Sequence, residues 1–315
     1  MAAARPSRDP WAVPEIPLLA RSAHDRLAER RDDADYLERA WRDDRSRVLL
    51  VSPDGTVPVS GPDEHPDLVL RRPAEITGEG VRVWLGEAAG VAYFAQLASS
   101  PVAVDGSWRT LREVGAYLTD LDVGLLTSAV ALRAWHYRHP RCPRCGAATE
   151  VAKAGWTRVC PVDGSEHFPR TDPAVIMLVH DGAGRCVLAR GPQWRTGRMS
   201  VLAGFVEAGE SAEAAVAREV AEEVGLAVRD IRYAGSQPHP FPASLMLGFT
   251  ARLDGDPTLR IDEAEICEAG WFTRDEVRRA TDWGSDEPGS GQLRGLPSTM
   301  SIARQLINGW LATGD

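Results

Sequence analysis

The fold is decided by Gly204-Phe-Val-Glu-Ala-Gly-Glu210, followed after seven residues by Arg218-Glu-Val-Ala-Glu-Glu-Val-Gly-Leu226. Glu219 and Glu223 are four residues apart, so a helix places both carboxylates on one face, with Glu222 one turn from Glu219. Like charges at this spacing repel one another and destabilise an isolated helix. Helix formation alone therefore does not explain why these three glutamates stand so close together.

The same segment has the end signals of a helix and a side that can be buried. Ser211 is a good N-cap residue and Gly225 a good residue for the position after the last turn, which predicts a helix ending at Val224. The apolar stripe that would hold this helix to a core consists of Val216, Val220 and Val224. The carboxylates beside that stripe suit Mg²⁺ or Mn²⁺, which prefer oxygen ligands and bridge phosphate oxygens. The ordinary alternative is a solvated acidic helix face.

The complete spacing is similar at every defined position to the Nudix box, Gly-x5-Glu-x7-Arg-Glu-U-x-Glu-Glu-x-Gly-U, in which U is apolar. This resemblance implies a loop–helix–loop, divalent metal ions, and hydrolysis of a nucleoside diphosphate linked to another group. It also implies that Arg218 pairs with Glu210. The metal ligands that it implies are the carbonyl of Ala203 and the carboxylates of Glu219, Glu223 and Glu265. Either Glu222 or Glu223 would take the proton from the attacking water.

A second signature follows the box, at Ser236-Gln-Pro-His-Pro-Phe-Pro-Ala-Ser244. Its three prolines stiffen the backbone and lack N–H donors, so the segment is not expected to form a central strand. It resembles the Ser-Gln-Pro-Trp-Pro-Phe-Pro-x-Ser signature of the NADH pyrophosphatase family of Nudix hydrolases. The substrate-lining residues that this resemblance implies are Arg112, Phe168, Gln237, Pro238, His239, Pro240, Phe241, Pro242, Ala243, Ser244 and Ala303. The alternatives are core packing for Phe168 and a solvated surface position for Arg112 and Glu265.

One position departs from the family, because His239 stands where the signature has tryptophan. An imidazole offers a smaller stacking face than an indole. Histidine also titrates near neutrality, so we expect it to add a positive charge near the diphosphate at lower pH.

Three cysteines precede the box, with Cys142 and Cys145 in a Cys-x2-Cys pair and Cys160 fifteen residues later. They resemble three quarters of the four-cysteine zinc ribbon of the same family. The fourth position is Asp163. Structural zinc prefers sulfur and nitrogen ligands but accepts carboxylate, so Asp163 or His167 would complete the site. The alternative is a ribbon that has lost its metal.

The chain-wide pattern predicts an α/β protein. Short β-like runs with turn signals fill 47–98, and a helix is expected over Leu121–Tyr137. Further strands are expected at 174–179, 186–189, 201–205, 228–233, 245–253 and 269–272, with a closing helix over 298–311. We therefore predict a Nudix α/β/α sandwich over 169–315, a β-rich N-terminal domain over 21–138, a small zinc-ribbon-like segment over 139–168, and a mobile segment over 1–20.

Composition narrows the class of protein. The 315 residues carry a formal net charge of −9, which argues against a long basic surface for nucleic-acid backbones. The first twenty residues contain no apolar stretch of the kind found in signal peptides, and apolar runs are too short to span a bilayer. Five unevenly spaced cysteines favour a metal site or free thiols over a disulfide framework. We expect a cytoplasmic protein without a membrane partner.

The resemblance implies cleavage of NADH or NAD to nicotinamide mononucleotide and AMP, removal of NAD caps from RNA 5′ ends, and a homodimer. Two alternatives remain at this stage. One is a Nudix hydrolase for another dinucleotide or a nucleotide sugar, which the histidine at position 239 leaves open. The other is a non-catalytic nucleotide-sensing module, which the complete set of box glutamates argues against.

Overall fold

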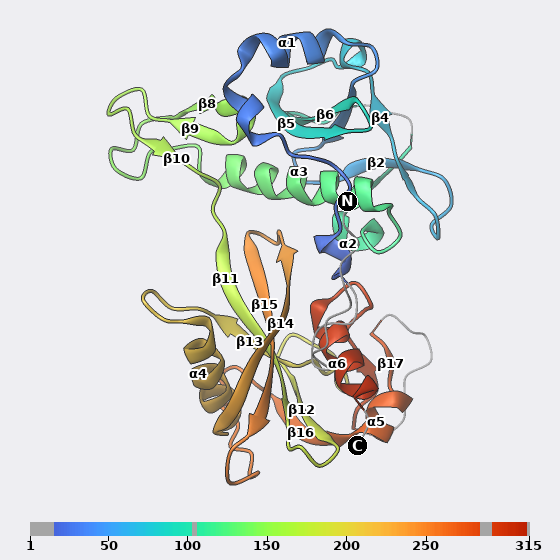
Figure 1. Ribbon diagram of the computed structural model, residues 1–315, viewed down its shortest axis with the longest axis vertical. Coiled ribbons are helices and arrows are strands. Elements are labelled where there is room, and N and C mark those ends of the chain that lie inside the picture. Colours follow the sequence, from blue (N-terminus) through green and yellow to red (C-terminus); the bar gives the residue numbers. More distant parts are fainter. Residues whose placement is uncertain (1–15, 103–105, 284–291, 314–315) are drawn as a thin grey trace. The chain divides into compact units, whose positions relative to one another are not determined.

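The computed structural model describes residues 16–102, 106–283 and 292–313 (Figure 1). Contacts divide the chain into two compact units. The N-terminal unit comprises Leu19–Thr171 with Pro238–Ala243, and the C-terminal unit comprises Asp172–Gln237 and Ser244–Asp315 with the short segment 16–18. The expected mobile segment 1–20 lies largely outside the described residues.

The N-terminal unit is rich in short strands, as its turn signals predict. Its strands are β1 (Arg47–Val51), β2 (Val57–Ser60), β3 (Asp67–Leu68), β4 (Leu70–Arg71), β5 (Gly80–Ala88), β6 (Val91–Ala98), β7 (Ser107–Arg109), β8 (Glu150–Ala152), β9 (Thr157–Val159) and β10 (Glu166–His167). Its helices are α1 (Ala34–Arg42), α2 (Leu111–Val114) and α3 (Asp120–Arg138), with 3-10 turns at Leu18–Ala20, Ala28–Asp32, Pro73–Glu75 and Lys153–Gly155.

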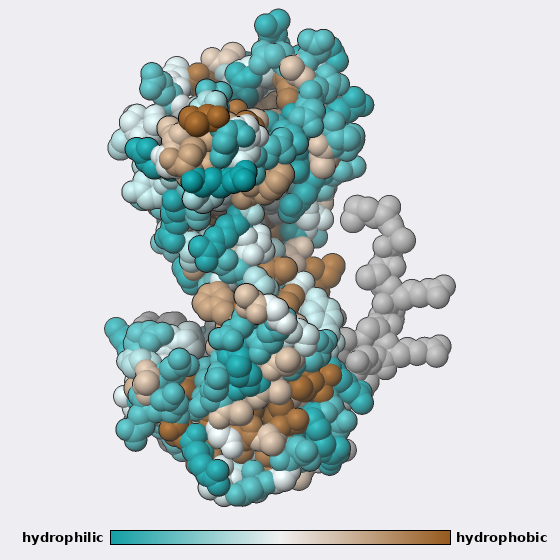
Figure 2. All heavy atoms as spheres, turned by 90° about the vertical axis from the view of Figure 1, so that its left-hand side faces the viewer, coloured by the Kyte–Doolittle hydropathy of each residue, from teal (hydrophilic) through white to brown (hydrophobic). Residues whose placement is uncertain are grey.

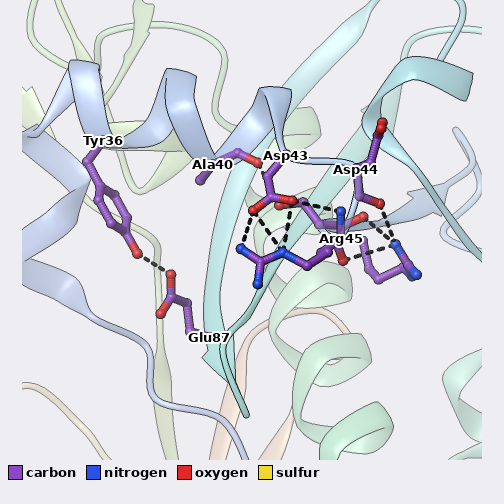
Figure 3. Close-up of polar contacts among 8 residues, drawn as sticks. Tyr36, Ala40, Asp43, Asp44, Arg45 and Glu87 are labelled. Atoms are coloured by element: carbon purple, nitrogen blue, oxygen red, sulfur yellow. Dashed lines mark hydrogen bonds and ion pairs between the residues drawn. The ribbon is translucent and has the colours of Figure 1, made fainter.

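Helix α1 packs on a four-stranded sheet of order β4-β1-β6-β5. The core between them contains Val48, Trp84 and Phe94, and the Trp84 and Phe94 rings meet edge to face at 5.1 Å. A polar contact adds to this packing, because the Tyr36 hydroxyl on α1 donates a hydrogen bond to Glu87 on β5 (Figure 3). Beyond the end of α1, Arg45 pairs with Asp43 at 2.7 Å in the same view.

Strand β5 continues through Gly86. The register shifts between Trp84 and Gly86, and the strand then runs to Ala88. A Cβ at Gly86 would lie 2.0 Å from the carbonyl oxygen of Asp25, whose backbone bridges Glu87. This glycine therefore marks a close approach of another chain segment and not a strand end.

Helix α3 spans the expected segment with one more residue at each end. No helix among the described residues is long and apolar enough to cross a membrane. In α3, His136 accepts a hydrogen bond from Arg158 on β9 at 2.9 Å. The other ring nitrogen of His136 lies 2.8 Å from the carbonyl oxygen of Gly155. Burial lowers the pKa of His136 to about 4, so the imidazole is neutral and can accept from Arg158. This contact ties α3 to the small sheet β10-β9-β8.

The C-terminal unit is built on a six-stranded sheet. Its strands are β11 (Asp172–His180), β12 (Arg185–Arg190), β13 (Leu202–Phe205), β14 (Val228–His239), β15 (Ser244–Leu253) and β16 (Glu268–Thr273), with the short pair β17 (Thr281–Asp282) and β18 (Gly295–Leu296) outside it. Its helices are α4 (Ala212–Val224), α5 (Arg274–Arg279) and α6 (Ile302–Ala312). The strand order is β14-β15-β11-β12-β16, with β13 paired to β11.

Strand alternation gives this sheet two apolar faces, and each face is covered by a helix. Val175, Met177 and Val179 of β11 pack with α4, in a core that also contains the predicted valine stripe. Ile176 and Leu178 of the same strand pack on the other side with α6. Because successive side chains of a strand point to opposite faces, one sheet lies between two helical layers (Figure 1). The predicted α/β/α sandwich is confirmed.

In the C-terminal unit, strand β14 and helix α5 differ most from the sequence-based expectation. Strand β14 runs six residues further than expected, to His239, and it remains an edge strand. Helix α5 was not predicted; its capping box, in which Thr273 and Glu276 bond each other's backbone N–H groups, is its sequence signal. Hydrophilic side chains cover most of the surface visible in Figure 2, with hydrophobic residues in small groups, as expected for a protein of this composition.

Candidate functional site

Helix α4 has the predicted ends and the predicted buried stripe. The Ser211 hydroxyl accepts a hydrogen bond from the N–H of Ala214, and Gly225 adopts a left-handed conformation with φ of 71°. All three valines of the stripe, Val216, Val220 and Val224, are fully buried. Burial of this stripe fixes the rotation of the helix, which in turn fixes where its glutamates point.

Arg218 joins the loop before α4 to the helix. It pairs with both carboxylate oxygens of Glu210 at 2.9 Å, which confirms the expected pairing. The same guanidinium donates to Glu219 at 2.9 Å, to Glu222 at 2.8 Å and to the carbonyl oxygen of Phe205 at 2.9 Å. Its hydrogen bond lowers the pKa of Glu210. One side chain therefore holds the loop, two helix glutamates and the end of β13 together.

Glu219 is pressed against strand β13. Its carboxylate lies so close to Gly204 that a Cβ on this glycine would be 1.9 Å from the carboxyl carbon. The glycine of the box is therefore required by the approach of a glutamate, a reason that spacing alone did not reveal. Burial raises the pKa of Glu219, and the hydrogen bond from Arg218 opposes that effect.

Glu223 is the most strongly perturbed carboxyl of the cluster. It is 6% exposed, and its Oε2 atom has no hydrogen-bond partner among the described residues. Burial and then the charges of Glu219 and Glu265 raise its pKa to about 8, while the backbone of Ala203 stabilises its charged form. The structure thus brings Ala203, Glu219, Glu223 and Glu265 together, as the resemblance implied.

Glu265 reaches this cluster through a loop that docks on the end of α4. The N–H of Arg260 bonds the carbonyl oxygen of Val224 at 2.8 Å, and the N–H of Asp262 bonds that of Glu223 at 3.1 Å. A turn at Asp262 then positions Glu265, whose N–H bonds the Asp262 carbonyl oxygen at 3.1 Å. The side chain of Glu265 is exposed, and its charge acts on both Glu219 and Glu223.

The cluster fits a divalent cation. Buried carboxylates that repel one another and leave an oxygen unpartnered are stabilised when a metal ion supplies positive charge. Glu222 differs from Glu219 and Glu223, because its side chain is 57% exposed. Of the two glutamates considered as the base, Glu223 is the one inside the cluster.

The raised pKa of Glu223 predicts a pH-dependent stability. A carboxyl with a folded pKa near 8 and an unfolded pKa near 4.5 binds more protons in the folded state between those values, so stability falls as pH rises through that window. We expect Glu223→Gln to melt higher than the wild type at pH 8 without added Mg²⁺ or Mn²⁺, and by much less at pH 5. Thermal unfolding at both pH values, with the exposed Glu222→Gln as control, measures this difference. Equal differences at the two pH values would contradict the assignment.

In the N-terminal unit, the loop Pro238–Ala243 carries an aromatic stack. The Arg112 guanidinium lies over the Phe241 ring at 3.8 Å. The His239 ring meets the same ring edge-on at 4.9 Å. Arg112 and His239 therefore both contact Phe241, which groups two of the expected substrate residues around a third.

The expectation that His239 titrates near neutrality is wrong. Burial and then the nearby charge of Arg112 lower its pKa to about 4. The imidazole is thus neutral between pH 6 and 7.5, and it adds no positive charge in that range.

The remaining expected substrate residues have varied environments. Gln237 is 3% exposed, and its Oε1 atom is without a hydrogen-bond partner among the described residues. Phe168 is 62% exposed, which excludes the core alternative. Ala303 is buried in the α6 core. Among the other loop residues, Pro240 is buried and Pro242 is exposed, while Pro238, Ala243 and Ser244 have intermediate exposure.

A separate cluster in the N-terminal unit consists of Cys142, Cys145, Cys160 and Asp163, whose ligand atoms all lie within 4.8 Å of one another. Burial raises the pKa of Cys142, but hydrogen bonds from Ser165 and from backbone N–H groups outweigh it and lower the value to about 6. Hydrogen bonds from Ser165 hold the pKa of Asp163 well below its usual range. Burial raises the pKa of Cys160 to about 11. Three cysteines and one carboxylate at this spacing fit a zinc ion, which binds cysteine as the thiolate. His167 lies beside Ser165 at 3.1 Å and is not part of the group.

Comparisons with known proteins agree with both sites. The profile described as NUDIX domain matches residues 170–290, and the profile described as NADH pyrophosphatase zinc ribbon domain matches 138–168. The chain is therefore a Nudix-domain protein with a zinc ribbon.

Similar proteins of known activity define the family more specifically. NAD-capped RNA hydrolase NudC of Mycobacterium bovis is 43% identical over 309 residues, which span 94% of this chain and 95% of that protein. The mitochondrial NAD(P)H pyrophosphatase NUDT13 of Mus musculus is 41% identical over 66% of this chain and 60% of its own length. NAD-capped RNA hydrolase NUDT12 of Homo sapiens is 37% identical over 62% and 43%. The chain belongs to the NudC family of NAD-capped RNA hydrolases.

Proposed function

We propose that this chain is a metal-dependent NAD(+)/NADH diphosphatase that releases nicotinamide mononucleotide and AMP, and that it also removes NAD caps from RNA 5′ ends. The observation that carries the proposal is the pair of buried carboxylates, Glu219 and Glu223, beside the backbone of Ala203 inside a complete box. The relatives support the choice of substrate, because the names of all three refer to NAD-capped RNA or to NAD(P)H.

The chemistry follows from the positions of these groups. Glu219, Glu223, Glu265 and the carbonyl of Ala203 would hold divalent ions, Mg²⁺ or Mn²⁺, which neutralise the diphosphate and make water a stronger acid. Arg218 fixes Glu219 through its 2.9 Å hydrogen bond. Glu223 would take the proton of the attacking water, because it is a buried carboxylate within the cluster and a carboxylate can act as a general base. The water oxygen bonds to phosphorus, the bridging P–O bond breaks, and the leaving phosphate oxygen keeps the electron pair.

Substrate binding is assigned to Arg112, Phe168, Ala303 and the loop from Gln237 to Ser244. The stack of Arg112 on Phe241 offers a flat, cationic surface that suits a base or nicotinamide ring next to phosphates. A structural zinc ion on the cysteine cluster, a homodimer and a cytoplasmic location complete the proposal.

The deciding experiment incubates the protein with NADH, NAD, ADP-ribose and a diadenosine polyphosphate, with Mg²⁺ or Mn²⁺, and identifies the products by mass. A short NAD-capped RNA is assayed alongside. We expect nicotinamide mononucleotide and AMP from the dinucleotides, and a 5′-monophosphate RNA from the capped substrate. Faster cleavage of ADP-ribose or the diadenosine compound would favour the other dinucleotide or nucleotide-sugar hydrolase. Absence of turnover with every substrate would favour the sensing module.

His239→Trp tests the departure from the family. His239 contacts Phe241 through its edge, and an indole would enlarge that apolar surface. Stacking on a base is worth roughly 1–3 kcal/mol, so we expect kcat/KM for NADH to rise by up to about tenfold. Because His239 is neutral between pH 6 and 7.5, the pH profile in that range should not change. A change in melting temperature with an unaltered kcat/KM would mean that the residue only packs beneath the loop.

A further inference from the structure

The C-terminal unit contains a groove on the α6 side of its sheet, with a volume of about 560 Å³. The side chains that define it are His180, Asp230, Arg232, Thr250, Arg252 and Arg274. Trp310 and Thr313 of the α6 end and the turn Gly182–Gly184 close its border. We call it the arginine groove.

Strand alternation explains why this groove is polar. On β11, Ile176 and Leu178 pack under α6, and His180 is the next residue on that face. In the parallel register with β15, Leu178 is paired with Thr250 and His180 with Arg252. The same face thus changes from apolar to polar beyond the end of α6, which marks a part of the sheet that the helix leaves open.

The groove carries more positive than negative charge. Three arginines face one aspartate, and Asp230 already accepts a hydrogen bond from Arg229 at 3.0 Å. Neither the Arg232 nor the Arg252 guanidinium forms a hydrogen bond or an ion pair with another residue that the structure describes. This local excess of positive charge stands out in a chain of net charge −9.

Arg274 and His180 give the groove a fixed frame. The guanidinium of Arg274 lies over the Trp310 ring at 4.4 Å and donates to the Trp310 carbonyl oxygen and to the Thr313 hydroxyl. His180 is 8% exposed, and burial, with the charge of Arg252 next, lowers its pKa. The Thr250 hydroxyl can donate a hydrogen bond without adding charge.

We propose that the arginine groove binds the phosphate group of a small ligand, on the sheet face opposite to α4 and its glutamates. Guanidinium groups bind phosphate through paired, charge-assisted hydrogen bonds, and Arg232 and Arg252 on neighbouring strands supply two of them. The volume lies within the range of small-molecule sites. The phosphate can come from free inorganic phosphate or from a nucleoside monophosphate.

Isothermal titration with inorganic phosphate and with AMP, without added divalent metal, tests the proposal. We expect saturable binding with one site per chain, and a loss of affinity of about tenfold or more in Arg252→Gln and in Arg232→Gln. Arg278→Gln is the matched control, because Arg278 is an exposed arginine of α5 outside the groove. Equal affinities for phosphate and AMP would identify the phosphate group alone as the ligand. Tighter binding of AMP would show that the groove also contacts the nucleoside. Either result supports the groove if Arg252→Gln removes the binding.

A second variant separates this groove from the carboxylate cluster. Glu219→Gln should bind phosphate and AMP like the wild type. Binding that survives Arg252→Gln but changes in Glu219→Gln would place the ligand at the cluster and overturn the proposal, as would the absence of saturable binding up to about 10 mM. Chemical modification of arginine with phenylglyoxal gives an independent readout, in which phosphate should slow the labelling of Arg232 and Arg252 but not of Arg278. Since neither measurement involves hydrolysis, failure here leaves the proposed function untouched.

Discussion

Replacing Glu219 or Glu223 by glutamine is expected to lower kcat for NADH hydrolysis by about two to four orders of magnitude, with the fold intact. Glutamine keeps the shape of the side chain and removes its negative charge. Both residues are at least nine-tenths buried, and the charge of Glu219 raises the pKa of Glu223. Water therefore cannot replace the negative charge that either substitution removes. Steady-state kinetics at saturating NADH, repeated over a Mn²⁺ titration, measures the loss.

Glu222→Gln is the matched control, because Glu222 is the neighbouring box glutamate with an exposed side chain. Its replacement removes one hydrogen bond to Arg218 and leaves the buried cluster in place. We expect a change in kcat of less than about tenfold, on the scale of a weakly coupled surface contact. If Glu222→Gln were the most damaging of the three and Glu223→Gln retained near wild-type kcat, Glu222 would be the base and the assignment to Glu223 would be wrong.

The sequence predicted helix α4 well because the signals for this helix are local. A cap residue, a stripe of valines at helical spacing and a left-handed glycine all lie within fifteen residues, and each acts on the backbone nearby. The Arg218–Glu210 pair was also predictable, since the resemblance fixed both positions. The resemblance did not give the reason for Gly204, which depends on the Glu219 carboxylate reaching a strand from another element.

Features that depend on distant contacts were harder to predict. Glu265 reaches the cluster only because Arg260 and Asp262 bond the last turn of α4, and no periodicity in the sequence encodes those hydrogen bonds. The neutral state of His239 has a similar origin. Its isolated pKa suggests titration near pH 6.5, but burial and the charge of Arg112, more than a hundred residues earlier, lower that pKa. The arginine groove likewise depends on where α6 ends relative to three strands.

Asp163→Cys is expected to strengthen zinc binding by about a hundredfold or more, because a fourth thiolate replaces a carboxylate in a structural zinc site. The wild-type site has three thiols and one carboxylate within 4.8 Å, so we expect it to take up one zinc ion per chain and to release it to EDTA. The variant should keep its zinc under the same dialysis. Metal analysis after dialysis, and competition with a chromophoric chelator, measure the two affinities.

The local backbone makes this substitution a fair comparison. The N–H of Gly164 bonds the carbonyl oxygen of Cys160 at 2.9 Å, and the N–H of Cys160 bonds that of Ser165 at 2.9 Å, which closes the turn around position 163. Asp163 also accepts hydrogen bonds from the backbone and hydroxyl of Ser165, and Ser165→Ala in the wild-type background measures what those contacts contribute. Asp163→Ala leaves three ligands and should lose zinc altogether. One equivalent of zinc that resists EDTA in the wild type would show that the carboxylate completes the site as firmly as a thiolate, and zinc retained by Asp163→Ala would exclude Asp163 as a ligand.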